Sequence, residues 1–140
     1  MPIDPSIVLF FELYASSFTK CDVSAISRLW HLPAFITADQ RSAVFDDEQR
    51  FASNTQALCD FYQRQGVVRA TKEVLATDEH YPGVVTVRTR DDLFGEDDSL
   101  VVTWEHTYMI RRIDGEWRVL IAVADGEVAA WNARGTPLGS

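Results

Sequence analysis

The stretch LVVTWEHTYMIRRIDGEWRVLIAVAD, residues 100–125, predicts a β-hairpin. Asp114-Gly115 is a strong signal for a two-residue turn, because both central residues of such a turn take positive φ. Side chains alternate between the two faces of a strand, so the even-numbered residues from 100 to 110 share one face. That face is aromatic and aliphatic except for His106. A polar ring in the middle of an apolar face indicates that the face lines a pocket.

The position of His106 in the sheet follows from the turn. If Ile113 pairs with Glu116, His106 lies opposite Val123, and Asp125 lies diagonal to it on the same face. A carboxylate there would favour the charged imidazole, whereas burial alone would favour the neutral one. The alternative is that His106 is an ordinary core residue satisfied by one hydrogen bond.

The rest of the chain predicts helices followed by strands. Asp4-Pro5 begins a first helix, Asp22 a second, and Asp46 with Gln49 has the spacing of a capping box for a third. Period-two patterns then predict strands over about 67–79, 83–94, 99–112 and 116–125. We therefore expect one α+β domain over 1–140, with a core of about 5–125 and a C-terminal tail over 126–140.

Composition excludes several classes of function. The net charge of −8 argues against nucleic acid and anionic membranes as partners, since both are polyanions. No apolar run approaches the length of a membrane span, and no leader is visible, so a cytoplasmic protein is expected. Cys21 and Cys59 are expected as reduced thiols, with one disulfide as the alternative. Ligand spacing for a metal and glycine-rich phosphate loops are missing, so no cofactor is expected.

Two segments carry a resemblance to a known family. DVSAISRLWHLPAFITAD (22–39) and the ending RRIDGEWRVLIAVAD (111–125) resemble the NTF2-like superfamily, which includes SnoaL-like proteins and ketosteroid isomerases. The resemblance implies a cone: a curved antiparallel sheet that encloses an apolar pocket and is covered by three N-terminal helices. It also implies a homodimer through the outer face of the sheet, where the pattern places Thr103, Thr107, Met109, Leu120, Ala122 and Ala124.

The chemistry of ketosteroid isomerases transfers only in part. Tyr14 matches the position of their helical tyrosine, but the position of the catalytic base falls on Ala38. Asp39 is one residue away and would face the other side of a strand unless the chain bulges. Steroid isomerisation is therefore not expected.

Three functions stay open at this point. The first is binding of a small apolar or aromatic molecule in the concave pocket. The second is cofactor-free proton transfer of the SnoaL-like kind, such as isomerisation, cyclisation or dehydration. The third is a non-catalytic dimeric interaction module with a filled cavity. The expected catalytic residues are His106, Asp125 and Tyr14. The expected ligand-binding residues are Trp30, Phe51, Val87, Trp104, Tyr108 and Ile121.

Overall fold

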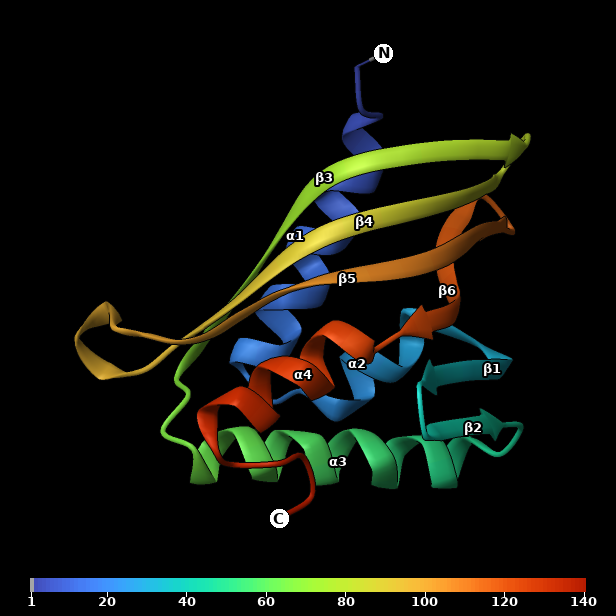
Figure 1. Cartoon of the computed structure of the whole chain (residues 1–140). Helices are drawn as coiled ribbons and strands as arrows, with labels where there is room; N and C mark the ends of the chain where they lie inside the picture. Colours follow the sequence, from blue (N-terminus) through green and yellow to red (C-terminus); the bar gives the residue numbers. More distant parts are fainter. Residues whose placement is uncertain (1) are drawn as a thin grey trace.

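Three helices precede a long sheet, and a fourth helix follows it, in a computed structural model that describes residues 2–140 (Figure 1). The helices are α1 (Pro5–Thr19), α2 (Val23–Arg28), α3 (Glu48–Arg64) and α4 (Asp125–Arg134). The strands are β1 (Trp30–Ala38), β2 (Arg41–Phe45), β3 (Arg69–Tyr81), β4 (Val84–Phe94), β5 (Leu100–Ile113) and β6 (Glu116–Val123), with a short 3₁₀ turn, η1 (Glu96–Asp98), before β5.

The N-terminal helices begin at carboxylate caps. The side chain of Asp4 accepts a hydrogen bond from the amide of Ser6, and that of Asp22 accepts one from the amide of Ala25. The cap of α3 is Asp47 and not Asp46, because Asp47 accepts hydrogen bonds from the amides of Gln49 and Arg50. The predicted starts of all three helices are therefore correct to within one or two residues.

The six strands form one sheet in the order β2-β1-β6-β5-β4-β3. Neighbouring strands are antiparallel except for β1 and β6, which are parallel. Figure 1 shows β3, β4 and β5 as long curved strands, with the helices on one side of them. This confirms the predicted α+β class and the curved sheet, and adds one parallel pair to an otherwise antiparallel arrangement.

The hairpin of β5 and β6 follows the predicted register only near its turn. Ile113 pairs with Glu116 and Ile110 with Val119, but Met109 pairs with Ile121, which leaves Leu120 as an extra residue. Such a bulge shifts the remaining residues by one, and a shift by one moves each side chain to the other face.

Because of the bulge, the predicted orientations of four residues are wrong. Ile121 and Val123 lie on the outer face and not in the pocket, whereas Ala122 and Ala124 line the pocket and do not belong to the outer face. His106 is consequently not opposite Val123; Thr107 is.

The strands β4 and β5 pair in a register that keeps their apolar side chains on the concave face. Thr89 pairs with His106, and Val87 pairs with Tyr108. Directly paired residues share a face of the sheet, so Val87 and Thr89 lie on the same face as His106 and Tyr108. On the opposite face Arg88 and Glu105 form an ion pair at 3.3 Å between Nε and Oε1, as a diagonal contact across the strands.

The segment predicted as a C-terminal tail contains α4, which Figure 1 shows between the sheet and α3. Trp131 on this helix is fully buried, and Gly135 ends the helix in the left-handed conformation. At Gly126 a Cβ atom would lie 2.3 Å from the carbonyl oxygen of Glu105. Glycine therefore permits the close approach of α4 to β5, and α4 becomes one wall of the space under the sheet.

Candidate functional site

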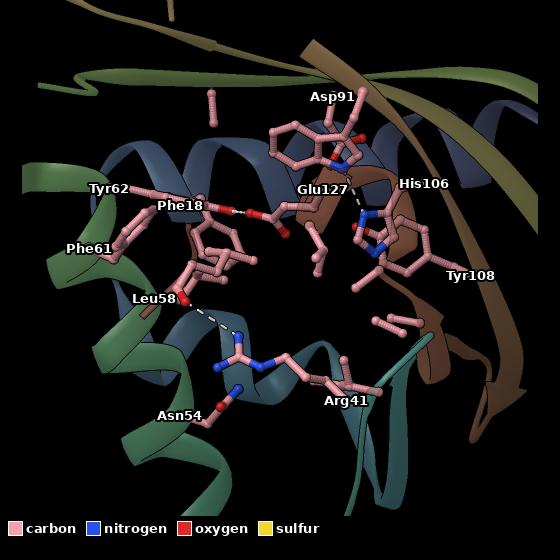
Figure 2. A pocket seen from close by; sticks show the side chains of 18 of the residues that line it. Phe18, Arg41, Asn54, Leu58, Phe61, Tyr62, Asp91, His106, Tyr108 and Glu127 are labelled. Atoms are coloured by element: carbon pink, nitrogen blue, oxygen red, sulfur yellow. Dashed lines mark hydrogen bonds between the residues drawn. The ribbon is translucent and has the colours of Figure 1, made fainter. Parts of the chain in front are cut away.

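A pocket of about 530 Å³ lies between the concave face of the sheet and the helices (Figure 2). We call five polar and aromatic side chains from β3, β4 and β5 in its lining the sheet wall: Lys72, Asp91, Trp104, His106 and Tyr108. We call four of the facing side chains from α3 and α4 the helix wall: Asn54, Leu58, Tyr62 and Glu127. Pockets of this kind, apolar with a few convergent polar groups, are typical of small-molecule sites.

His106 is held as a neutral ring in the sheet wall. It is 6% exposed, and its Nδ1 accepts a hydrogen bond of 2.9 Å from Nε1 of Trp104. Its ring stacks on Tyr108 at 4.5 Å between centroids. Burial lowers the pKa of His106 to about 3, with a further lowering by the charge of Lys72 and an opposing effect of Asp91.

This arrangement fixes what His106 offers to the pocket. A neutral imidazole whose Nδ1 accepts carries its proton on Nε2. Nε2 makes no hydrogen bond with any residue from 2 to 140. His106 is therefore a hydrogen-bond donor for a bound oxygen or nitrogen, and a poor proton acceptor near neutral pH.

Lys72 and Asp91 form a buried ion pair beside His106. The ammonium group of Lys72 lies 2.5 Å from Oδ2 of Asp91 and donates a hydrogen bond of 2.7 Å to the hydroxyl of Tyr108. The other carboxylate oxygen of Asp91 accepts a hydrogen bond of 2.6 Å from Thr89. The side chains of the pair are only 8% and 3% exposed, so each charge depends on the other for its compensation.

Glu127 is the buried carboxyl group of the helix wall. Its Oε2 accepts hydrogen bonds from the hydroxyl of Tyr62 and, at 3.3 Å, from Nε1 of Trp131. Burial raises the pKa of Glu127 to about 7, although the hydrogen bond from Tyr62 and the charge of Lys72 lower it. Figure 2 shows Glu127 and His106 in the same cavity. A carboxyl group with this pKa can exchange a proton near neutral pH.

Tyr14 reaches the pocket from α1. Its hydroxyl accepts a hydrogen bond of 2.8 Å from Nε1 of Trp30, and both side chains are buried. Burial raises the pKa of Tyr14, so the hydroxyl keeps its proton and remains a donor.

The structure brings together five of the predicted site residues in the pocket lining. They are Tyr14, Trp30, Trp104, His106 and Tyr108.

The other four predicted site residues lie elsewhere. Phe51 packs against Trp30 at 5.0 Å between ring centroids, and Val87 is buried in the core; neither lines the pocket. Ile121 faces outward because of the bulge at Leu120. Asp125 is an exposed residue in the first turn of α4 and does not line the pocket, so the expected contact with His106 is wrong. The strand ends at Val123, before the predicted diagonal position is reached.

Sequence reasoning missed all four charged residues of the pocket lining, which are Arg41, Lys72, Asp91 and Glu127. Asp91 has the same parity as Val85 and Val87, so it interrupts an apolar strand face just as His106 does. Glu127 had a weaker signal: it precedes Trp131 by four residues, the helical spacing. Lys72 had no signal of its own, since lysines on strands are usually solvated.

Within residues 2–140 no group of three histidine, cysteine or acidic side chains is placed to hold a metal ion. No helix in this part of the chain has both the length and the apolar character required to cross a membrane.

The curved sheet, the covering helices and the internal pocket define the class of NTF2-like α+β cones. The chain belongs to a family of this class: the model of the family described as "NTF2-like protein (DUF6841)" matches residues 5–127. This confirms the superfamily that the sequence resembles. No protein with a curated description matches the chain.

Solved structures share the fold at low sequence identity. An NTF2-like protein of unknown function from Shewanella oneidensis is 12% identical, with a TM-score of 0.68 over 85% of this chain and 95% of that one. A ketosteroid isomerase-like protein from Erwinia carotovora atroseptica is 14% identical, with a TM-score of 0.63 over 85% and 92%. A putative aromatic ring hydroxylase from Novosphingobium aromaticivorans is 12% identical, with a TM-score of 0.61 over 88% and 89%. These similarities concern the fold alone.

Proposed function

We propose that this protein binds a small, largely apolar or aromatic molecule in its concave pocket. The observation that carries the proposal is a cavity of about 530 Å³ with an aromatic lining, in which Nε2 of His106 is a donor without a partner among residues 2–140. Apolar surface provides most of the binding free energy in such sites, and a few polar groups orient the ligand. The same volume argues against the alternative of an interaction module with a filled cavity.

The binding test uses a neutral dye, N-phenyl-naphthylamine, whose fluorescence rises in apolar surroundings. We expect saturable binding with one site per chain. Ala57 lines the pocket at an exposed position of α3, so Ala57→Trp should fill the mouth and abolish the signal. Ala129→Trp is the matched control, because Ala129 is an exposed helical residue outside the pocket. Absence of saturable binding, or equal binding by both variants, would contradict the proposal.

A second function, proton transfer on a carbonyl compound, is favoured by the pairing of Glu127 with His106 in one cavity. A carboxyl group with a pKa of about 7 can take a proton from carbon, while Nε2–H of His106 donates to the developing oxyanion. This assignment differs from the expected catalytic set of His106, Asp125 and Tyr14: Glu127 is the base, His106 is a hydrogen-bond donor, and Asp125 has no part. The transferred proton goes to the carboxylate and returns to the enolate, so atoms and charges balance.

The catalytic test follows hydrogen–deuterium exchange at the α-carbon of β-tetralone in heavy water by NMR. We expect exchange above the buffer background that increases as pH rises through 7, because Glu127 must be ionised to act as the base. Glu127→Gln should return the rate to background while dye binding persists. Exchange at the wild-type rate in that variant would exclude Glu127 as the base.

We also propose the homodimer expected from the sequence, through the outer face of the sheet. Val44, Phe35, Ile121 and Met109 form a row across four neighbouring strands on that face. Val44 is 56% exposed and the other three are half-buried, so the row forms a contiguous apolar patch of the kind that a second subunit covers. Ile121→Lys should convert a dimer to a monomer in sedimentation equilibrium, and a wild-type monomer at all concentrations would contradict the proposal.

A further inference from the structure

The cations that line the pocket differ in how they are compensated. Lys72 is neutralised by Asp91 inside the sheet wall. Arg41, at the start of β2, also lines the pocket, yet within residues 2–140 no carboxylate lies within ion-pair distance of its guanidinium group. Several other arginines also lack a carboxylate partner among residues 2–140, but of these only Arg41 lines the pocket. Its charge is therefore available to a bound ligand.

Arg41 and its neighbour Asn54 provide hydrogen-bond donors that are largely without acceptors. One Nη of Arg41 donates a long hydrogen bond of 3.4 Å to the backbone carbonyl of Leu138. Figure 2 shows the guanidinium group directed toward Asn54 of α3, which also lines the pocket. The side-chain amide of Asn54 makes no hydrogen bond with any residue from 2 to 140. Two donor groups thus lie at the mouth of an apolar cavity with only a neutral carbonyl as partner.

The other charged groups of the pocket leave Arg41 as the group that can bind an anion. Asp91 is compensated by Lys72, and Glu127 is hydrogen-bonded to Tyr62 at the helix wall. Arg41 and Asn54 are both exposed residues, so a charged group bound there would stay partly hydrated and would not incur a full desolvation cost. A guanidinium fork matches the geometry of a planar carboxylate or another oxyanion.

We propose that the pocket selects amphipathic organic anions, with an apolar or aromatic body inside and an anionic head group bound by Arg41 and Asn54 at the mouth. The proposal rests on the proposed binding function and names the class of ligand. The head group replaces the carbonyl of Leu138 as the hydrogen-bond acceptor of Arg41. The apolar body extends toward His106, whose Nε2–H is placed for a second polar atom of the ligand.

The test compares two dyes that share one ring system. N-phenyl-naphthylamine is neutral, and anilinonaphthalene sulfonate carries one negative charge on the same scaffold. We expect the anionic dye to bind more tightly to the wild-type protein. Arg41→Gln should weaken the anionic dye by roughly three- to tenfold, as expected for a partly exposed charged hydrogen bond, and leave the neutral dye unchanged. Arg41→Lys should fall between, because it keeps the charge without the fork.

Two controls separate a specific site from general attraction. Arg28→Gln removes the same charge from an exposed position of α2 outside the pocket and should change neither affinity. Added salt should weaken the anionic dye and not the neutral one, since screening acts on exposed charges. Unchanged binding of the neutral dye by Arg41→Gln shows at the same time that the pocket is intact.

Each outcome decides between the proposals. If the neutral dye binds and Ala57→Trp blocks it, but Arg41→Gln leaves the affinity of the anionic dye unchanged, the inference is overturned and the binding function stands. If Arg28→Gln weakens the anionic dye as much as Arg41→Gln does, only the net charge matters and the inference is again overturned. If neither dye binds, both proposals fail.

Discussion

The two walls of the pocket handle buried polar groups in different ways. In the sheet wall, Lys72 and Asp91 compensate each other, and Trp104 occupies one nitrogen of His106. In the helix wall, Glu127 receives hydrogen bonds from Tyr62 and Trp131 but has no cation within ion-pair distance among residues 2–140. Burial consequently lowers the pKa of His106 to about 3 and raises that of Glu127 to about 7. The same loss of hydration leaves a fixed neutral donor on one wall and an exchangeable proton on the other.

The largest effect is expected from breaking the ion pair of the sheet wall. Asp91→Ala leaves the ammonium group of Lys72 buried without its partner, and the free energy of unfolding should fall by about 3–5 kcal/mol. Urea denaturation followed by tryptophan fluorescence measures the change.

The control for this prediction removes both charges together. The double variant Lys72→Met/Asp91→Leu should be less destabilised than Asp91→Ala, because it leaves no uncompensated charge. A double variant that loses as much stability as the sum of the single variants would show that the two side chains act independently.

A second test compares how the two walls contribute to the pH dependence of the free energy of unfolding. The raised pKa of Glu127 means that the folded state holds a proton that the unfolded state releases, so stability falls as pH rises from about 4.5 to about 7. The lowered pKa of His106 means that the unfolded state binds a proton that the folded state does not, so stability falls as pH drops from about 6.5 toward 3. Between about 4.5 and 6.5 the two slopes have opposite signs.

Variants should reveal each slope separately in pH-dependent urea denaturation. In the wild type, the titration of Glu127 lowers the free energy of unfolding by about 3 kcal/mol as pH rises from about 4.5 to about 7. Glu127→Gln removes this loss, so the stability of the variant should rise more steeply with pH than that of the wild type. His106→Asn keeps an acceptor for Trp104 and removes the titrating ring, so its stability should fall as pH rises. Subtracting the wild-type free energy of unfolding at each pH cancels the contributions of the other titrating groups. If the free energy of unfolding changes with pH in the same way for all three proteins, the pKa values of Glu127 and His106 are not shifted by burial as expected.

The smallest effect concerns how the helix wall is held against the sheet. In an ordinary helix, glycine to alanine stabilises by up to about 1 kcal/mol. At Gly126 the added Cβ would lie 2.3 Å from the carbonyl oxygen of Glu105, so Gly126→Ala should instead destabilise by about 2 kcal/mol. Thermal unfolding measures the sign, and Ala129→Gly on the exposed side of α4 gives the propensity effect alone. A stabilising Gly126→Ala would refute the close approach of α4 to β5.

The sheet wall was largely predictable, whereas the helix wall was not. Strand parity placed Trp104, His106 and Tyr108 on one face, and the structure has them on that face. Parity also contained the signal for Asp91, since the residue interrupts the apolar face of β4. The charged member of the helix wall, Glu127, belongs to α4, whereas the period-two pattern predicts a strand through Asp125. The strand in fact ends at Val123, and a helix follows.

The sequence by itself determined the local features: helix starts at Asp4 and Asp22, the Asp114-Gly115 turn, and the phase of β5. These depend on neighbours a few residues apart, through capping, turn geometry and side-chain alternation. Only the tertiary structure decided the bulge at Leu120, the docking of α4, and the pairing of Lys72 with Asp91. It also decided the pKa values, because burial and charge at a side chain are set by residues that are distant in the chain, such as Tyr62 beside Glu127.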